Sequence, residues 1–385
     1  MADADLSAER DRTSFSAETN DSLERLARVA RRLLPRMQED GGPFFSHKTF
    51  RRDGRYVNRE GNPLYTAMVI VGALADDSDA AGLATGARLD ALYAAASTSA
   101  HSSLLGTAAW ALAAAGDARA RDLMAASERL DLRQGPSMGL GLLLAGAAAA
   151  AGDAGSEAAA RRVGTIALAE LTARFAARAR VVRAQGFDRN RESLVYGGVT
   201  SFASQVYPLL GASLYAERFG EDPPSWLGAV ADRLVEAQGP LGQWWWLYST
   251  RDGSVIDGYP VYSVHQDGMA FMALVPLERL GIGDYADALR RGVEWIFGAN
   301  ELSAPLVDED DPFFLRAIQR RGSHADAHWG MSRPGLARVA LATRGLASAA
   351  GVRAEPRRLE LLRECRSYHL GWVLLARSLV SGRRH

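Results

Sequence analysis

Apolar residues recur at intervals of three and four along most of this 385-residue chain, which is the period of an α-helix. This pattern predicts helices over residues 23–37, 64–74, 89–96, 104–115, 140–151, 158–179 and 202–219. Further helices are expected after Trp226, Tyr262, Tyr285, Gly335 and Tyr368. The chain therefore belongs to the all-α class.

The predicted helices are of two kinds that alternate. Segments 23–37, 158–179 and 285–297 carry a charged face, whereas 64–74, 102–115 and 138–152 carry no charge. A helix without a polar face has to be buried on every side. We therefore expect an α/α toroid, an (α/α)6 barrel whose inner helices surround a central cavity. The inner helices are expected to begin near Pro63, Ser102, Ser137, Thr200, Pro260 and Ser367, and the stretch 303–354 breaks the alternation.

Composition narrows the partners and the compartment. Lys+Arg and Asp+Glu are equal at 45 each, so no general excess of positive charge is available to bind nucleic acid. The one cysteine, Cys365, excludes an internal disulfide and a thiolate-rich zinc site. The first residues lack the basic start and apolar run of a signal peptide, and the uncharged runs 138–152 and 193–216 are too short or too polar to span a bilayer. We expect a cytoplasmic protein with a disordered tail over residues 1–21 and one domain over 22–385.

A repeat links the two halves of the chain. Gln38, Asp53-Gly54 and Pro63-Leu64-Tyr65 recur in the same order as Gln238, Asp252-Gly253 and Pro260-Val261-Tyr262. In both copies we expect an outer helix to end at Gln, an extended stretch to turn at Asp-Gly, and Pro to occupy the first turn of an inner helix.

The second copy also carries a recognisable motif. Gln238, Gly242 and Trp244 resemble the QW motif of the toroid superfamily of terpenoid cyclases and protein prenyltransferases, and Gln38, Gly42 and Phe44 resemble it more weakly. In this motif the Gln amide can cap a helix end while the aromatic ring packs on a neighbouring helix. The resemblance implies the toroid fold. Other α/α-toroid enzymes act on glycans, so the fold does not choose the activity.

Reactive side chains in such a fold are expected at the starts of the inner helices. This rule selects Tyr65, His101, Tyr196, Ser201, Gln205, Tyr259, Tyr262, His265, Gln266, Asp267, Tyr368, His369 and Trp372. Within the densest group, His265 with Tyr262 and Asp267 could transfer protons, with Tyr262 and Gln266 on one helix face. The alternative is that these side chains satisfy backbone groups in a crowded core, and the same alternative applies to Tyr368 and His369.

An acidic run offers a second candidate. Asp308-Glu309-Asp310-Asp311 fits Asp-x-Asp-Asp, the proton-donor motif of class II terpene cyclases. By resemblance Asp310 is the central acid, with Asp308 and Asp311 around it, because crowded carboxylates raise a pKa. The run is followed by Pro312-Phe313-Phe314 rather than by the polar helix start of that family, and a solvated turn remains the alternative.

Two further segments could contact a substrate. Residues 244–248 predict an aromatic strand in which Trp246 can face the cavity and stabilise a cation or stack on a sugar, although core packing is the alternative. The basic loop 47–55 could present Arg51 and Arg52 to a diphosphate or an acidic sugar, or form a solvated hairpin.

No metal or cofactor is expected. His324 and His328 stand four residues apart, which suits two ligands on one helix face, but no third ligand is evident nearby. A phosphate-binding Gly-x4-Gly-Lys loop is absent from the sequence.

These patterns favour a small-molecule enzyme. The leading hypothesis is a terpenoid-cyclase-like enzyme that cyclises an isoprenoid by protonation, with Asp310 or Asp267 as the acid. The alternatives are a carbohydrate-active barrel enzyme, whether hydrolase, lyase or epimerase, and a non-catalytic binding scaffold. A site lined by Asp, His and Arg favours glycans, whereas a dry aromatic tube favours isoprenoids.

Overall fold

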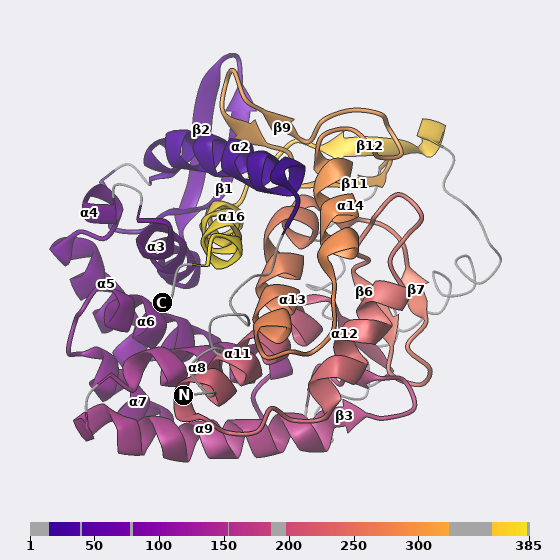
Figure 1. The fold of residues 1–385 in the computed structure, drawn as a ribbon. Coiled ribbons are helices and arrows are strands. Elements are labelled where there is room, and N and C mark those ends of the chain that lie inside the picture. The colour runs from indigo at the N-terminus through magenta and orange to yellow at the C-terminus, as the bar shows by residue number, and fades with distance from the viewer. Residues whose placement is uncertain are drawn as a thin grey trace, which may run out of the picture.

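The computed structural model describes residues 15–38, 41–77, 80–152, 154–185, 198–322 and 356–382. Within them, six inner helices form a ring: α3 (Pro63–Asp76), α6 (Ser102–Ala114), α8 (Ser137–Ala150), α11 (Ala203–Phe219), α13 (Ala270–Arg279) and α16 (Ser367–Val380). Each contacts the next, and α16 contacts α3, so the ring closes (Figure 1). The toroid class is confirmed, and five of the six inner helices begin at or within three residues of the predicted start; α13 does not begin at Pro260.

Outer helices precede the inner ones along the chain: α2 (Ala17–Leu33), α5 (Gly86–Ser97), α7 (Ala120–Ser127), α9 (Ala154–Arg174), α12 (Trp226–Glu236) and α14 (Ala286–Ile296). Burial follows the sequence pattern. Almost every residue of α8 is buried, whereas α2 buries one face and exposes the other. Short helices in the described residues include α4 (Ala80–Leu83), η1 (Leu34–Met37) and η4 (Pro356–Arg358).

Inner helices approach one another through glycine. Gly72 of α3 lies against the Gly371 carbonyl of α16, and Gly211 of α11 lies against the Gly141 carbonyl of α8. A Cβ atom at Gly72 or Gly211 would overlap the facing backbone, so only glycine permits this spacing. Direct backbone contact makes the wall of the ring tight.

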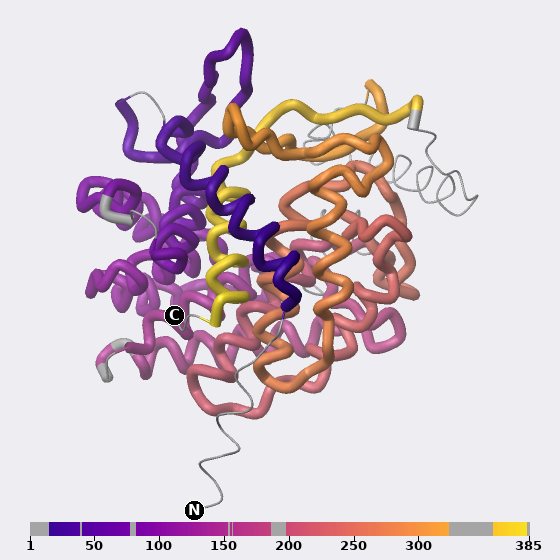
Figure 2. Tube along the Cα trace, turned by 45° about the horizontal axis from the view of Figure 1, so that its top comes forward, coloured from indigo at the N-terminus to yellow at the C-terminus, as the bar shows by residue number. Residues whose placement is uncertain are grey.

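Antiparallel strands connect the helices. Three sheets have two strands: β1 (Ser46–Arg52) with β2 (Arg55–Gly61), β3 (Phe175–Ala176) with β4 (Val181–Val182), and β9 (Val307–Asp308) with β10 (Phe313–Phe314). In one three-stranded sheet, β6 (Leu247–Ser249) lies between β5 (Val199–Ser201) and β7 (Val255–Asp257). In the other, β11 (Ala317–Arg320) lies between β8 (Val261–Tyr262) and β12 (Leu359–Leu362). Hairpins β1–β2 and β9–β10 and strand β12 lie at one end of the molecule, the top of Figure 1. Figure 2 shows α16 beside α2, which it contacts.

Several expected boundaries differ from the structure. Helix α2 begins at Ala17, inside the segment for which we expect a tail, because Ser16 caps it by accepting a bond from the Thr19 amide. Residues 1–14 lie outside the described part of the chain. Helix α9 ends at Arg174 rather than continuing to residue 179, because the chain there turns into the β3–β4 hairpin.

The repeat also differs between its two copies. Asp53-Gly54 and Asp252-Gly253 both form turns between antiparallel strands, as expected. Pro63 opens α3, as expected, but Pro260 does not lie in a helix. It precedes β8, and a π-helical turn, η2 (His265–Met269), leads into α13. Tyr262 is consequently the end of a strand and does not share a helix face with Gln266.

Candidate functional site

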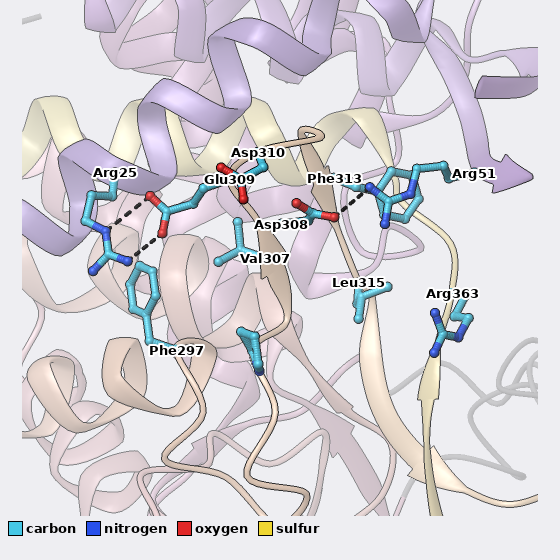
Figure 3. A pocket seen from close by; sticks show the side chains of 11 residues that line it. Arg25, Arg51, Phe297, Val307, Asp308, Glu309, Asp310, Phe313, Leu315 and Arg363 are labelled. Carbon is cyan, nitrogen blue, oxygen red and sulfur yellow. Dashed lines mark hydrogen bonds and ion pairs between the residues drawn. The ribbon is translucent and has the colours of Figure 1, made fainter. Parts of the chain in front are cut away.

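The acidic run forms an exposed turn between β9 and β10, here called the acidic turn (residues 308–311). Its carboxylates are engaged by arginines: Arg51 Nη1 lies 2.8 Å from Asp308 Oδ2, and Arg25 Nη2 lies 2.5 Å from Glu309 Oε1 (Figure 3). The Tyr56 hydroxyl donates to Asp311 Oδ1 at 2.8 Å. The turn is thus an anchor between α2 and the β1–β2 hairpin.

These contacts give the acidic turn the opposite electrostatics from a proton donor. Partial burial opposes ionisation of Asp308, but the hydrogen bond and charge of Arg51, together with backbone bonds from Asp311 and Asp310, outweigh it and keep the pKa of this carboxyl below its usual value. The bond from Arg25 likewise lowers the pKa of Glu309. Asp310 is exposed at the tip of the turn. Asp308 and Glu309, which pair with arginines, are thus held ionised, and an ionised carboxylate does not protonate an alkene.

The two arginines of the basic loop lie on the β1–β2 hairpin. Arg51 points to the acidic turn and lies 5.3 Å over the Phe313 ring. Arg52 is exposed and lies 5.7 Å over the Phe50 ring. Both therefore belong to the outer end of the molecule and do not reach the starts of the inner helices.

A buried ion pair joins two inner helices near their starts. His369 Nε2 lies 2.8 and 2.9 Å from the two carboxylate oxygens of Asp267, and both residues are buried. Asp267 comes from the π-helical turn η2, and such turns are frequent at functional sites. Burial raises the pKa of the Asp267 carboxyl, because the charged form loses its hydration in the interior.

His265 lies in the same turn but faces aromatic rings. Its centroid is 4.7 Å from that of Phe202 and 5.2 Å from that of Tyr262. Burial lowers the pKa of His265 to about 3, which keeps the imidazole neutral at physiological pH. A neutral imidazole can accept a proton, but it carries no charge for ligand binding.

Tyrosines from two neighbouring inner helices pack against each other with their rings tilted by 50°. The rings of Tyr65 (α3) and Tyr368 (α16) are 4.6 Å apart, and that of His47 lies 5.1 Å from Tyr65. Asn62 fixes the start of α3 by accepting a bond from the Tyr65 amide at 3.0 Å. Burial raises the pKa of Tyr368, so its phenol remains protonated through the neutral range.

Three charged residues beside these tyrosines are not among the candidates that the sequence pattern selects. Glu364 accepts bonds from two guanidinium groups, those of Arg316 and, at 3.0 Å, Arg366. Arg366 Nη1 also lies 2.5 Å from His47 Nε2, and the Arg316 guanidinium lies 5.1 Å over the Tyr262 ring. Burial opposes ionisation of Glu364, but the two arginines outweigh it and lower its pKa.

These side chains form the polar cluster, defined as His47, Tyr65, Arg316, Glu364, Arg366 and Tyr368. Arg316 follows β10, Arg366 immediately precedes α16, and His47 lies in β1, so three separate segments converge on the starts of α3 and α16. Tyr65, Tyr368 and Arg316 are half-buried, whereas Glu364 and Arg366 are buried. The cluster therefore combines rigid charge with partly accessible proton donors.

Other predicted residues hold the structure together. Gln205 accepts a bond from the Val182 amide at 2.7 Å, and Gln266 accepts one from the Trp244 amide at 3.0 Å. The Tyr259 hydroxyl donates to Glu301 at 2.8 Å. Gln205 and Gln266 are fully buried, and both side-chain amides form hydrogen bonds with backbone groups.

The predicted aromatic residues pack in the interior. Trp372 donates to the Tyr207 hydroxyl at 3.0 Å and lies 6.2 Å from the Trp110 ring. These three residues come from alternate inner helices, so they meet across the middle of the ring. Trp246 packs at 5.5 Å on Tyr262, but it precedes β6, so the expected strand over residues 244–248 begins only at Leu247.

The motif glutamine makes two contacts. Gln238 Nε2 donates to the Gly242 carbonyl at 3.0 Å and to the Ala288 carbonyl of α14 at 2.8 Å. The Trp244 ring is fully buried against Gly292. The side chains thus connect the end of α12 to its neighbouring outer helix.

Some candidates make no comparable contact or cannot be placed. His101 is exposed, and Ser201 bonds to Ser204. Tyr196, His324 and His328 lie outside the described residues. Within the part of the chain that the structure describes, no group of three His, Cys, Asp or Glu residues could hold a metal ion, and no helix is long and apolar enough to cross a membrane.

Comparison with known proteins shows the fold without naming a family. No family model and no curated protein matches the sequence. A solved structure of a possible GH105 family member from Salmonella enterica serovar Paratyphi A is 12% identical, with a TM-score of 0.55 over 96% of this chain and 95% of that chain. This similarity independently supports the α/α toroid.

Two further solved structures are more distant. An unsaturated glucuronyl hydrolase from Bacillus sp. GL1 is 15% identical, with a TM-score of 0.43 over 92% of this chain and 94% of that chain. A type II terpene cyclase from Scytonema is 13% identical, with a TM-score of 0.36 over 95% and 98%. At such identities a similarity concerns architecture, and activity has to be argued from the side chains.

Proposed function

We propose that this chain is a carbohydrate-active α/α-barrel enzyme that cleaves a glycan containing acidic sugars at the polar cluster. The observation that carries the proposal is the convergence of Arg316, Glu364 and Arg366 beside the packed rings of Tyr65 and Tyr368. This favours the glycan alternative over cyclisation of an isoprenoid, because ionic and hydroxyl groups at the inner-helix starts suit a hydroxylated substrate.

Arginine supports the choice of an acidic sugar. Arg316 and Arg366 bring two guanidinium groups to one carboxylate, and Arg316 remains partly accessible. A guanidinium binds a carboxylate through two parallel hydrogen bonds, which fixes the orientation of the sugar ring. Arg316 is therefore the group that we assign to the carboxylate of the substrate.

Tyr368 is suited to protonate the leaving oxygen. Hydrolysis and β-elimination both break the bond between a sugar carbon and the glycosidic oxygen, and both require a proton for that oxygen. Burial raises the pKa of Tyr368, so the phenol holds its proton at neutral pH. Asp267 and His369 are buried, and we assign them a positioning role, because their hydrogen bond joins η2 to α16, the helix that carries Tyr368.

The test is a glycan assay with two readouts. Polygalacturonate, hyaluronate and alginate are incubated with the purified chain, and starch and mannan serve as neutral controls. New reducing ends report any cleavage, and ultraviolet absorbance of a conjugated double bond reports elimination. Cleavage of an acidic glycan that Arg316→Ala abolishes supports the proposal. Cleavage of only neutral glycans, or of none, contradicts it.

A further inference from the structure

A recess lies on the outer side of the molecule, across the chain segments that carry Arg316 and Glu364 of the polar cluster. It has a volume of about 650 Å³ and is bounded by α2, the end of α14 and the β9–β10 hairpin (Figure 3). Pockets of this size hold small ligands. The recess therefore has room for one or two sugar units.

Two arginines of the recess are held in place. Arg25 donates two hydrogen bonds to the Glu309 carboxylate, from Nη2 at 2.5 Å and from Nε at 3.2 Å. Its guanidinium lies 4.3 Å from the centroid of the Phe297 ring. Arg51 pairs with Asp308 and lies over Phe313. Each guanidinium is thus fixed between a carboxylate and an aromatic face, so these walls are rigid and close to neutral in charge.

The third arginine is different. Arg363 is exposed, and its guanidinium makes no ion pair or hydrogen bond with the described residues. In Figure 3 it stands beside Leu315, on the side of the recess opposite Arg25. A free guanidinium at the edge of a recess can receive a carboxylate through two hydrogen bonds.

The space between the arginines is apolar. Val307 and Leu315 lie between Arg25 and Arg363 in Figure 3, and Pro305 also lines the recess. The carbon-bound hydrogens of a sugar ring pack on such side chains, while its hydroxyl groups need acceptors nearby. Asp310, whose carboxylate has no partner among the described residues, lies on the rim and can supply one.

The recess and the polar cluster share two chain segments but use opposite faces of them. Leu315 and Arg363 line the recess, whereas the next residues, Arg316 and Glu364, pair with each other in the polar cluster. Successive side chains of an extended segment point to opposite sides. The two places are therefore separated by a wall one chain thick, and one sugar unit cannot occupy both.

We propose that this recess is a second, non-catalytic binding site for a uronate unit, with the sugar carboxylate on Arg363 and the ring over Val307 and Leu315. The choice of ligand rests on the proposed function, while the existence of the site rests on the recess. A glycan held here would keep a polymeric substrate on the enzyme between cleavage events.

Binding of monosaccharides tests the proposal without any need for turnover. Titration calorimetry and ligand-observed NMR compare D-glucuronate and D-galacturonate with neutral D-glucose and D-galactose. The uronates are expected to bind the wild-type chain, and Arg363→Ala is expected to lower the number of bound uronates by one or to weaken that site at least about 10-fold. Arg129→Ala, which removes another exposed arginine, is the matched control and should leave binding unchanged.

Several results would overturn the second site. They are uronate binding that is identical in Arg363→Ala and wild type, neutral sugars that bind as well as uronates, and inorganic sulfate that competes as well as a uronate. The failures remain distinguishable. Arg363-dependent binding without glycan cleavage contradicts only the proposed function, whereas cleavage with Arg363-independent binding contradicts only the second site.

Discussion

The acidic turn and the polar cluster are built from the same chemical groups, arginines and carboxylates, yet they differ in surroundings. Arg25 and Glu309 are each more than one-third exposed, at 37% and 36% of their side chains. Arg316 and Glu364 are exposed by only 15% and 7%. Water screens the first pair more than the second, so the same kind of ion pair anchors a loop in one place and organises a site in the other.

The largest expected difference is in stability. Glu364→Ala leaves two largely buried guanidinium groups without their shared carboxylate and is expected to lower the free energy of unfolding by about 3–5 kcal/mol. Glu309→Ala, the matched change in the acidic turn, is expected to cost at most about 1 kcal/mol. Urea denaturation followed by circular dichroism measures both. Equal losses in the two variants would remove the distinction between the regions.

The second largest difference between the polar cluster and the acidic turn is expected in kcat. Tyr368→Phe removes the proposed proton donor while keeping the ring packed on Tyr65, and it is expected to lower kcat by about 100-fold with little change in KM. Asp311→Asn, in the acidic turn, is expected to leave both constants unchanged. Initial rates on the glycan identified by the screen provide the measurement. A large loss of kcat in Asp311→Asn with an active Tyr368→Phe would reverse the assignment.

Lowering the pH should change the stability contributions of two buried carboxyls, Glu364 and Asp267, in opposite directions. The pKa of Glu364 is lowered by folding, so its contribution to stability is present above its unfolded pKa of about 4.3 and is lost as pH falls toward its folded value. The pKa of Asp267 is raised by burial, so its contribution declines as pH rises through its unfolded value of about 3.9.

Removing each group therefore changes the acid limb in a different direction. Glu364→Gln should flatten the loss of stability below about pH 4.3. Asp267→Asn should make stability fall more steeply with falling pH above about pH 3.9, because protonation of Asp267 in the folded state stabilises the wild type across that window. Urea midpoints measured from pH 3 to pH 6 in steps of about half a unit test both slopes. Parallel acid limbs in wild type and both variants would contradict the linkage.

The smallest effect is expected at Arg51. Arg51→Ala breaks its pairs with Asp308 and Asp311, yet these groups are partly exposed, so the expected cost is below about 1 kcal/mol. Salt screens such pairs, and the difference from wild type should shrink further at about 1 M sodium chloride. Thermal denaturation at low and high salt provides the comparison. A cost that persists in high salt would show that Arg51 acts through packing.

The fold could be predicted because buried helices lack charged residues, and this lack is visible in the sequence. Helices without charge, such as α6 and α8, have to lie inside charged ones, and Asp-Gly marks the two hairpin turns. Boundaries were less predictable where a tertiary contact decides them. The π-helical turn at His265 displaces the start of α13 from Pro260, and no local pattern announces it.

The site could be predicted only in part. Tyr65, Tyr368, His369 and Asp267 follow from the rule that reactive groups lie at inner-helix starts. Arg316 lies far from any such start in sequence, and pairing of β11 with β8 and β12 brings its segment there. Arg366 and Glu364 could have been found by extending the rule three residues upstream of α16.

Ring closure by α16 has a consequence for how the protein is made. This helix packs against α3 and α2, from which it is separated by about three hundred residues of chain. During synthesis, the apolar flanks of α3 and α13 stay uncovered until residues 367–380 have been translated. Until then the emerging chain exposes apolar surface, so a chain that terminates before residue 367 is expected to aggregate.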